Sequence, residues 1–173
     1  MSRELFVLRH CKSDWDNAIR QDEFRPLSPR GEKNAELLSN WMSGESLSPE
    51  LVLCSTAVRA RQTLELVNKS LQIPENRIQF LAGLYLASLK TLLQFLSEVD
   101  ISYKSVLIVG HNPGLDYLVE NISRNKPPRT GSGKLMTTGC LAHFECSDNW
   151  QTLTHNGNLL SITRPADIIE HRR

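Results

Sequence analysis

Arginine and histidine side chains recur directly after three short apolar stretches of the chain. They are Arg9 and His10 after residues 5–8, Arg59 after residues 51–54, and His111 after residues 106–109. Two guanidinium groups can hold several oxygens of one tetrahedral dianion through paired hydrogen bonds. Two imidazoles allow one ring to attack phosphorus while the other hydrogen-bonds the transferred oxygens. This combination of side chains predicts chemistry on a phosphoryl group.

A few placed cations, rather than a general positive charge, must supply any recognition of an anion. The chain has 20 Lys and Arg residues against 19 Asp and Glu residues, a net charge of +1. This balance argues against a nucleic-acid binder that relies on bulk phosphate attraction. One guanidinium about 4 Å from a phosphoryl charge contributes ~4 kcal/mol at an effective dielectric of about 20. Arg9 and Arg59 together would therefore offset much of the charge that develops during phosphoryl transfer.

The three apolar stretches are predicted to be strands of one sheet. Residues 5–8, 51–54 and 106–109 are short, rich in branched apolar side chains and free of alternation, as strands buried on both faces are. In open parallel sheets, ligands bind at the carboxyl ends of the strands. We therefore expect the arginines and histidines that follow these strands to meet at one edge of the sheet.

Segments with helical periodicity lie between the predicted strands. Apolar side chains recur at helical spacing in residues 35–42, 60–71, 89–96 and 115–122. Ser28 before Pro29 and Asn112 before Pro113 each predict a capped helix start, and Gly44 is a candidate C-cap. The alternation of strands and helices predicts an α/β fold. We expect a three-layer sandwich whose central sheet is mostly parallel, with helices on both faces.

The last quarter of the chain has a different pattern. From about residue 136 the apolar residues repeat with a period of two, which predicts strands over residues 138–146 and 150–155, towards an edge of the sheet. Residues 124–134 contain a pair of prolines and two glycines and are predicted to form a loop. This loop could cover a site.

Length and composition suit one cytoplasmic domain. The 173 residues are expected to form a single domain, residues 1–173, with a core at about residues 3–165 and a short C-terminal tail. No apolar run approaches the ~20 residues of a membrane-spanning helix, and the N-terminus lacks the apolar stretch of a secretory signal. The cysteines form no C-x-x-C pair, so we expect free thiols in a reducing cytosol. Nothing in these features indicates an oligomeric state.

The motifs around the charged residues resemble those of the histidine phosphatase superfamily. They are Arg9-His10, Ser55-x-x-x-Arg59-Ala60-x-Gln62-Thr63, and Val109-Gly110-His111-Asn112-Pro113-Gly114. Within that superfamily, further motifs are similar to those of SixA-type phosphohistidine phosphatases: Arg9-His10-Cys11-Lys12-Ser13, Arg25-Pro26-Leu27-Ser28-x-x-Gly31, Leu84-Tyr85 and the closing strand from Thr138 to Glu145. The resemblance extends from about residue 3 to about residue 165. It implies a fold like that of phosphoglycerate mutase.

The resemblance also implies a mechanism. His10 would be the nucleophile and would take the phosphoryl group as a phosphohistidine intermediate before water removes it. The other expected site residues are Arg9, Arg59 and His111 for the phosphate pocket, and Lys12, Ser13 and Asn112 for contacts with the substrate. The expected activity is a metal-independent phosphohydrolase without a cofactor, acting on phosphohistidine in a phosphorylated protein. No nucleic-acid or membrane partner is expected.

Two departures from the family pattern affect the expected chemistry. Cys11 follows the Arg-His pair, where a small residue is usual; its thiol could crowd the phosphate, or be oxidised if Arg9 lowers its pKa. Residues 81–86 contain no carboxylic acid, although related mutases and broad phosphatases carry one there to protonate an alcohol leaving group. This favours a P–N bond over an alkyl phosphoester. The candidate acids that are left are Asp14, Asp16 and Asp22.

Other readings of the same residues stay open. A zinc site from His10, Cys11, Cys54 and His111 has suitable ligand types, but adjacent residues of an extended chain point in opposite directions. A cysteine phosphatase needs five residues between its thiolate and an arginine, and Cys54 and Arg59 have four between them. The same chemistry could serve a small-molecule phosphatase or mutase. A binding module that recognises phosphate without cleaving it is the last alternative.

Overall fold

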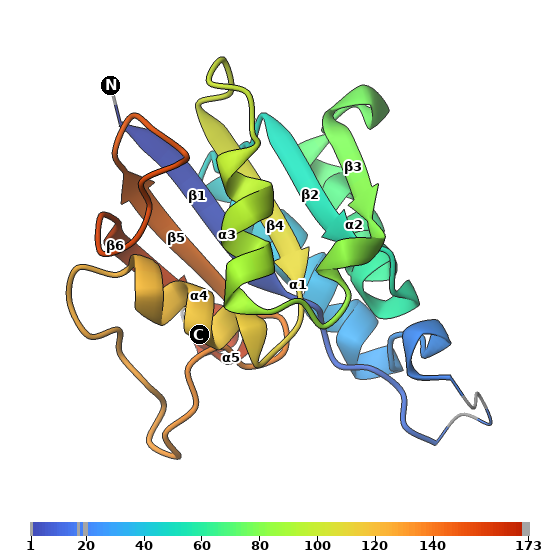
Figure 1. Cartoon of the computed structure of the whole chain (residues 1–173). Coiled ribbons are helices and arrows are strands. Elements are labelled where there is room, and N and C mark those ends of the chain that lie inside the picture. Colours follow the sequence, from blue (N-terminus) through green and yellow to red (C-terminus); the bar gives the residue numbers. More distant parts are fainter. Residues whose placement is uncertain (1, 17, 19–20, 171–173) are drawn as a thin grey trace.

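A six-stranded sheet forms the centre of the computed structural model (Figure 1), which describes residues 2–16, 18 and 21–170. The strands are β1 (Arg3–Arg9), β2 (Leu51–Ser55), β3 (Ile78–Leu81), β4 (Ser105–Gly110), β5 (Leu141–Cys146) and β6 (Asn158–Thr163). Their order across the sheet is β3-β2-β4-β1-β5-β6. The first four strands are parallel to one another, whereas β5 is antiparallel to β1 and to β6. The predicted α/β fold with a mostly parallel sheet is therefore confirmed.

Helices cover both faces of this sheet. They are α1 (Pro29–Gly44), α2 (Val58–Leu71), α3 (Leu89–Ser97), α4 (Gly114–Ile122) and α5 (Pro165–Glu170), with short 3-10 turns η1 (Asp22–Phe24), η2 (Glu75–Arg77) and η3 (Ala82–Leu84). Figure 1 shows α3 and α4 on the near face and α1 and α2 on the far face. Among the described residues, no helix is long and apolar enough to cross a membrane.

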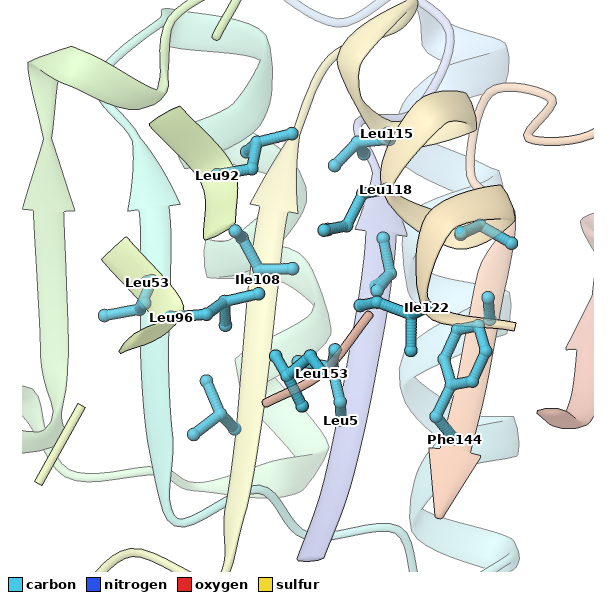
Figure 2. Packing of buried hydrophobic residues seen from close by; sticks show 14 of the residues in the cluster. Leu5, Leu53, Leu92, Leu96, Ile108, Leu115, Leu118, Ile122, Phe144 and Leu153 are labelled. Carbon is cyan, nitrogen blue, oxygen red and sulfur yellow. The ribbon is translucent and has the colours of Figure 1, made fainter. Parts of the chain in front are cut away.

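Alternate residues of the central strands supply two separate cores. Leu5, Val106 and Ile108 pack with side chains of α3 and α4 (Figure 2), whereas neighbours such as Phe6 and Leu107 pack with α1 and α2. Every residue of β2 and β4 is buried. Because both faces of these strands are covered, their sequences are apolar throughout rather than alternating. The central strands are therefore held rigidly from both sides.

The helix starts follow the predicted signals in one case and depart from them in another. The Ser28 hydroxyl accepts a hydrogen bond from the Gly31 amide at 3.1 Å and caps α1, as predicted. Asn112 does not cap α4, because the helix begins at Gly114 and Pro113 occupies its N-cap position. Gly44 is the last residue of α1 rather than a residue beyond it.

The C-terminal region corrects one predicted strand. Residues 150–155 form turns, and the last strand is β6 at residues 158–163. The apolar side chains of Trp150 and Leu153 are buried in the core from these turns, so their spacing reflects tertiary packing and not strand alternation. The predicted loop at residues 124–134 has no helix or regular strand. Part of the predicted tail forms α5, whose Ile168 packs against the α1 side, and residues 171–173 lie outside the described residues.

Candidate active site

The carboxyl ends of three neighbouring strands form one wall of a cavity. In the sheet register, Arg9 of β1 is opposite Gly110 of β4, and Cys54 of β2 is opposite Val109. The side chains that follow these strands therefore meet, as the sequence predicts. The cavity has a volume of about 380 Å³, and all seven predicted site residues line it: Arg9, His10, Lys12, Ser13, Arg59, His111 and Asn112. Other side chains at the cavity are those of Trp15, Asp22, Arg25, Leu86 and Thr138.

His10 is held as a neutral ring with one nitrogen open to reaction. Its Nδ1 lies 2.7 Å from the carbonyl oxygen of Cys11, which can only accept, so Nδ1 carries the proton. The lone pair is then on Nε2, to which the Nε of Arg59 donates at 3.3 Å. Burial, assisted by the charges of nearby groups, lowers the pKa of His10 to about 3. At neutral pH, His10 therefore has the protonation state that a nucleophile needs.

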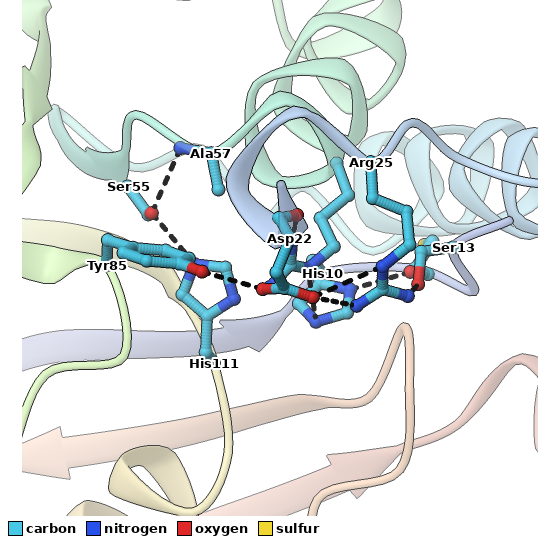
Figure 3. Close-up of polar contacts among 10 residues, drawn as sticks. His10, Ser13, Asp22, Arg25, Ser55, Ala57, Tyr85 and His111 are labelled. Atoms are coloured by element: carbon cyan, nitrogen blue, oxygen red, sulfur yellow. Dashed lines mark hydrogen bonds and ion pairs between the residues drawn. The ribbon is translucent and has the colours of Figure 1, made fainter. Parts of the chain in front are cut away.

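His111 lies beside His10 and has a free nitrogen. The ring centroids of the two histidines are 5.1 Å apart. The Nε2 of His111 lies 2.8 Å from the Ser55 hydroxyl, which accepts a hydrogen bond from the Ala57 amide (Figure 3). Because the hydroxyl can donate its hydrogen to Nε2, Nδ1 can carry the ring proton, and among the described residues this buried Nδ1 has no hydrogen-bond partner. Burial lowers the pKa of His111 to about 4. The ring is thus suited to donate one hydrogen bond to an anion.

Arg59 and Asp22 are joined at the centre of the cavity. The buried guanidinium of Arg59 donates to the Asp22 carbonyl oxygen at 2.7 Å and to its Oδ2 at 2.9 Å. The carboxylate of Asp22 also accepts from Tyr85 at 2.7 Å and from Arg25 at 2.6 Å (Figure 3). Burial alone would raise the pKa of Asp22, but the hydrogen bonds from Tyr85 and Arg25 and the charge of Arg59 lower it well below its usual range. Asp22 is therefore ionised.

The other two candidate acids do not line the cavity. Asp14 accepts a hydrogen bond from the amide of Asp16 at 2.9 Å, and Asp16 is exposed. Among the described residues, Asp22 is thus the carboxylic acid of the cavity, and its ionisation leaves it without a proton to give to a leaving group. This arrangement agrees with the preference for a P–N bond that the sequence predicts.

The guanidinium of Arg9 is held by a hydrogen bond to the backbone and has further N–H donors that an anion can use. Its Nη1 donates to the Met136 carbonyl oxygen at 2.9 Å, and its buried Nε has no hydrogen-bond partner in the part of the chain that the structure describes. Burial lowers the pKa of the Arg9 guanidinium, while the nearby Asp116 raises it. A guanidinium has five N–H donors, so hydrogen bonds from Arg9 are available to an anion in the cavity.

The three predicted substrate contacts differ in their freedom. Lys12 is exposed, whereas the buried hydroxyl of Ser13 accepts a hydrogen bond from Arg25. The Nδ2 of Asn112 donates to Asp116 at 3.0 Å and to the Met136 carbonyl oxygen at 2.9 Å. In this conformation Asn112 has no N–H left for a phosphate. The roles of these residues in substrate binding stay predictions.

The thiol of Cys11 points away from the cavity and does not crowd it. Cys11 is fully buried in a small cluster with Leu27 and Ala35. Burial raises the pKa of its thiol to about 12, so proximity to Arg9 does not make it a thiolate. Burial also raises the pKa of Cys54, which argues against a cysteine nucleophile there. His10 and Cys11 point in opposite directions, as the extended backbone predicts.

Sequence reasoning assigned no role to Ser55, Arg25 or Tyr85. Ser55 ends β2 and positions His111, while Arg25 and Tyr85 reach Asp22 from loops. All three lie within the motifs on which the family resemblance depends, and membership of these motifs could have indicated that they belong to the site. The hydrophobic pattern of the sequence does not indicate a site position for Arg25 or Tyr85, because neither residue directly follows a buried strand of the central sheet.

Two glycines allow these loops to approach the site. A Cβ atom at Gly31 would lie 2.0 Å from the carbonyl oxygen of Lys12, and one at Gly114 would lie 2.1 Å from that of Ala87. Any other residue would push the backbone apart at these positions, since real Cβ contacts are never so short. The loop after β1 is therefore fixed against α1, and the turn after Tyr85 is fixed against α4.

The chain is similar to known phosphatases in both sequence and structure. Residues 5–84 match the model of the histidine phosphatase superfamily (branch 1). Phosphohistidine phosphatase SixA of Escherichia coli (strain K12) is 30% identical over 158 residues, which cover 86% of this chain and 92% of that protein. An uncharacterized protein of Mycobacterium tuberculosis is 32% identical over 151 residues, covering 80% of this chain and 92% of that protein.

A solved structure of the protein histidine phosphatase SixA complexed with tungstate has a TM-score of 0.79 to this chain and is 28% identical in sequence. The match covers 95% of this chain and 99% of that one. The similarity therefore includes the whole sheet and the ends of the strands that line the cavity.

Proposed function

The chain belongs to the histidine phosphatase superfamily, and on this premise we propose that it removes phosphoryl groups from phosphohistidine in proteins, with His10 as the nucleophile. The observation that carries the proposal is the state of His10: a neutral ring whose Nε2 lone pair lies in a cavity with two guanidinium groups. A nucleophile of this kind can accept a phosphoryl group without first losing a proton.

The first step transfers the phosphoryl group to His10. The lone pair of Nε2 attacks phosphorus, and the electron pair of the P–N bond leaves with the donor ring, whose other nitrogen carries a proton, so a neutral imidazole is released. The hydrogen bond from Nδ1 to the Cys11 carbonyl supports the positive charge that develops on the ring. Arg9, Arg59 and the Nδ1 of His111 would donate to the phosphoryl oxygens as negative charge shifts among them.

The second step returns the enzyme to its starting state. Water attacks phosphorus, the bond to His10 Nε2 breaks, and inorganic phosphate leaves while Nε2 recovers its lone pair. The same donors would stabilise both transition states, because the phosphoryl oxygens face the same guanidinium groups and the same imidazole in each step.

The ionised state of Asp22 supports the choice of substrate. An alkoxide leaving group needs a proton from a general acid, whereas an imidazole leaves with much less help. The hydrogen bonds from Arg25, Tyr85 and Arg59 keep Asp22 deprotonated, so it is poorly suited to protonate an alkoxide. The tungstate in the similar SixA structure is also in keeping with a site for a tetrahedral oxyanion.

The test is a measurement of intact mass after incubation with a phosphoryl donor. The parent protein, His10→Asn and the control His155→Asn would each receive phosphoramidate, and then a protein phosphorylated on histidine. His155 is exposed and lies outside the cavity, so the same substitution there leaves the chemistry in place. We expect a transient acid-labile adduct of one phosphoryl group in the parent and in His155→Asn, and none in His10→Asn.

Other outcomes would contradict the proposal in different ways. Turnover of sugar phosphates without turnover of phosphohistidine would indicate a small-molecule phosphatase. Phosphate binding without an adduct or hydrolysis of any donor would indicate a binding module. An adduct that persists in His10→Asn would show that a different residue is the nucleophile.

A further inference from the structure

Two large apolar side chains are exposed at the mouth of the cavity. Trp15 is 71% exposed and Leu86 is 54% exposed, and both line the cavity that holds His10. Single exposed apolar residues are common on protein surfaces, but two at one catalytic cavity form a feature of the site. Neither side chain belongs to the charged set that would contact the phosphoryl group.

The backbone at Leu86 is in a conformation that leucine rarely adopts. The Ala87 amide donates to the Leu84 carbonyl oxygen at 3.4 Å and closes a turn over residues 84–87. Tyr85 has φ −66° and ψ 115°, and Leu86 has φ 47°, as in a type II turn, whose third position favours glycine. Leucine there carries backbone strain and gains little burial in return. Strain of this kind is typical of functional sites.

The turn holds Leu86 firmly beside the reacting groups. The Tyr85 ring meets the His111 ring edge-on, with centroids 5.5 Å apart, and its hydroxyl donates to Asp22. The close approach of Gly114 to the Ala87 carbonyl fixes the other end of the turn. Leu86 is thus presented at a set position and is not a side chain of a loose loop.

Trp15 contacts Arg25, which lies on the opposite side of Asp22 from Tyr85 (Figure 3). The Arg25 guanidinium lies over the Trp15 ring, 3.6 Å from its centroid, and Arg25 also bonds to Ser13 and Asp22. In Figure 3, Arg25 and Ser13 are on one side of Asp22, and Tyr85 and His111 are on the other. The partners of Trp15 and Leu86 therefore flank the centre of the site from opposite sides.

We propose that Trp15 and Leu86 determine specificity by contacting the polypeptide on the two sides of a phosphohistidine side chain. This inference rests on the proposed function and names what surrounds the phosphoryl group. Phosphoramidate has no carbon surface to bury against these side chains, whereas a polypeptide offers aliphatic and aromatic surface on both sides of the phosphohistidine. Exposed aromatic and aliphatic side chains around a polar centre are suited to such contacts.

Contacts outside the phosphoryl group have a characteristic kinetic effect. They bind the ground state and the transition state alike, so their loss raises KM and leaves kcat almost unchanged. A donor too small to reach them is not affected. The two side chains should therefore matter for a phosphorylated protein and not for phosphoramidate.

The experiment compares Trp15→Ala and Leu86→Ala with the control Leu160→Ala on both donors. Leu160 is 50% exposed on the edge strand β6, so it matches Leu86 in residue type and exposure but lies away from the cavity. For the histidine-phosphorylated protein, we expect kcat/KM to fall about fivefold or more in each mouth variant, mainly through KM. For phosphoramidate, and for Leu160→Ala on either donor, we expect a change of less than about twofold.

Leu86→Gly separates the side chain from the strain. Glycine accepts a positive φ, so this variant should melt no lower than the parent while showing the same loss with the protein donor. Equal losses on both donors, or no loss on the protein donor, would overturn the inference while the proposed function stands. A parent that hydrolyses phosphoramidate but no phosphohistidine protein would overturn both.

Discussion

The floor and the mouth of the cavity are built in different ways. The floor consists of side chains at the ends of β1 and β4 and in the first turn of α2, and His10, Arg59 and His111 are almost fully buried there. The mouth consists of side chains from the loop after β1 and from the turn after η3, and its apolar members are exposed. The difference is in keeping with our two proposals: the strand ends and the start of α2 would fix the chemistry, and the loops would select the substrate that reaches it.

The largest expected effect is the loss of a cation from the floor. Arg59→Ala should lower kcat/KM about 1,000-fold, because ~4 kcal/mol of interaction with the phosphoryl charge disappears. Arg61→Ala is the matched control on the same helix, since its guanidinium lies over Phe80, away from the cavity. Circular dichroism would check that both variants fold. A similar loss in the two variants would break the contrast between the floor and its surroundings.

The buried histidines of the floor should make stability depend on pH. The pKa of His10 is about 3 and that of His111 about 4, both below the value of about 6.5 in an unfolded chain. The unfolded state therefore binds more protons as the pH falls, and stability present above pH ~6.5 is lost towards pH ~4. Between pH 7 and 5 we expect a loss of about 2 kcal/mol for each histidine.

Urea unfolding at pH 7 and pH 5 measures this loss. The double variant His10→Asn/His111→Asn should have a flatter dependence of unfolding free energy on pH than the parent, while His155→Asn should keep the parent's slope. An unchanged slope in the double variant would mean that the two rings have the same pKa in the folded protein as in the unfolded chain.

The variant Ser55→Ala tests whether the proposed reaction depends on the orientation of the His111 ring. The variant removes the hydroxyl that directs Nε2 of His111, so the ring can take up the other tautomer, and kcat should fall about tenfold. In a double-mutant cycle with His111→Asn, the two losses should not add, because both act through one ring. Fully additive losses would show that Ser55 acts elsewhere.

The smallest effect on activity is expected for Tyr85, whose hydroxyl links the turn at the mouth to Asp22 in the cavity. Tyr85→Phe removes one of the hydrogen bonds to Asp22 but leaves those from Arg25 and Arg59. We expect kcat/KM to change by no more than about fivefold, since the removed bond is one of several at an exposed hydroxyl. Steady-state kinetics with phosphoramidate measures it. A loss as large as that of Arg59→Ala would place Tyr85 among the groups of the floor.

The contrast between the floor and the mouth also explains how much of the fold and the site can be predicted from the sequence. Strands buried on both faces have a clear apolar signature, so β1, β2 and β4 and the side chains at their ends could be placed in advance. The α/β fold followed from the same signature. The position of the Cys11 thiol is harder to predict from the sequence. The direction of the backbone after β1 alone decides that the thiol enters a small apolar cluster and not the cavity.

Predictions from the sequence are wrong where tertiary contacts override the local pattern of apolar and capping residues. Trp150 and Leu153 have the spacing of a short strand but reach the core from turns. Asn112 has the type of a capping residue, yet α4 begins at Gly114 with Pro113 at its N-cap, and the Asn112 amide group donates to Asp116 and the Met136 carbonyl. The positions of Arg25 and Tyr85 depend on loops, whose paths a single sequence does not determine.

The carboxylate of Asp22 has a consequence for the end of the catalytic cycle. It holds the Arg59 guanidinium, which inorganic phosphate would also use, so the released product has an internal competitor for part of its binding site. Product inhibition should accordingly be weak, and a substrate must bring further contacts if it is to bind where free phosphate does not stay. An enzyme built in this way can keep working in a cell whose phosphate concentration is high.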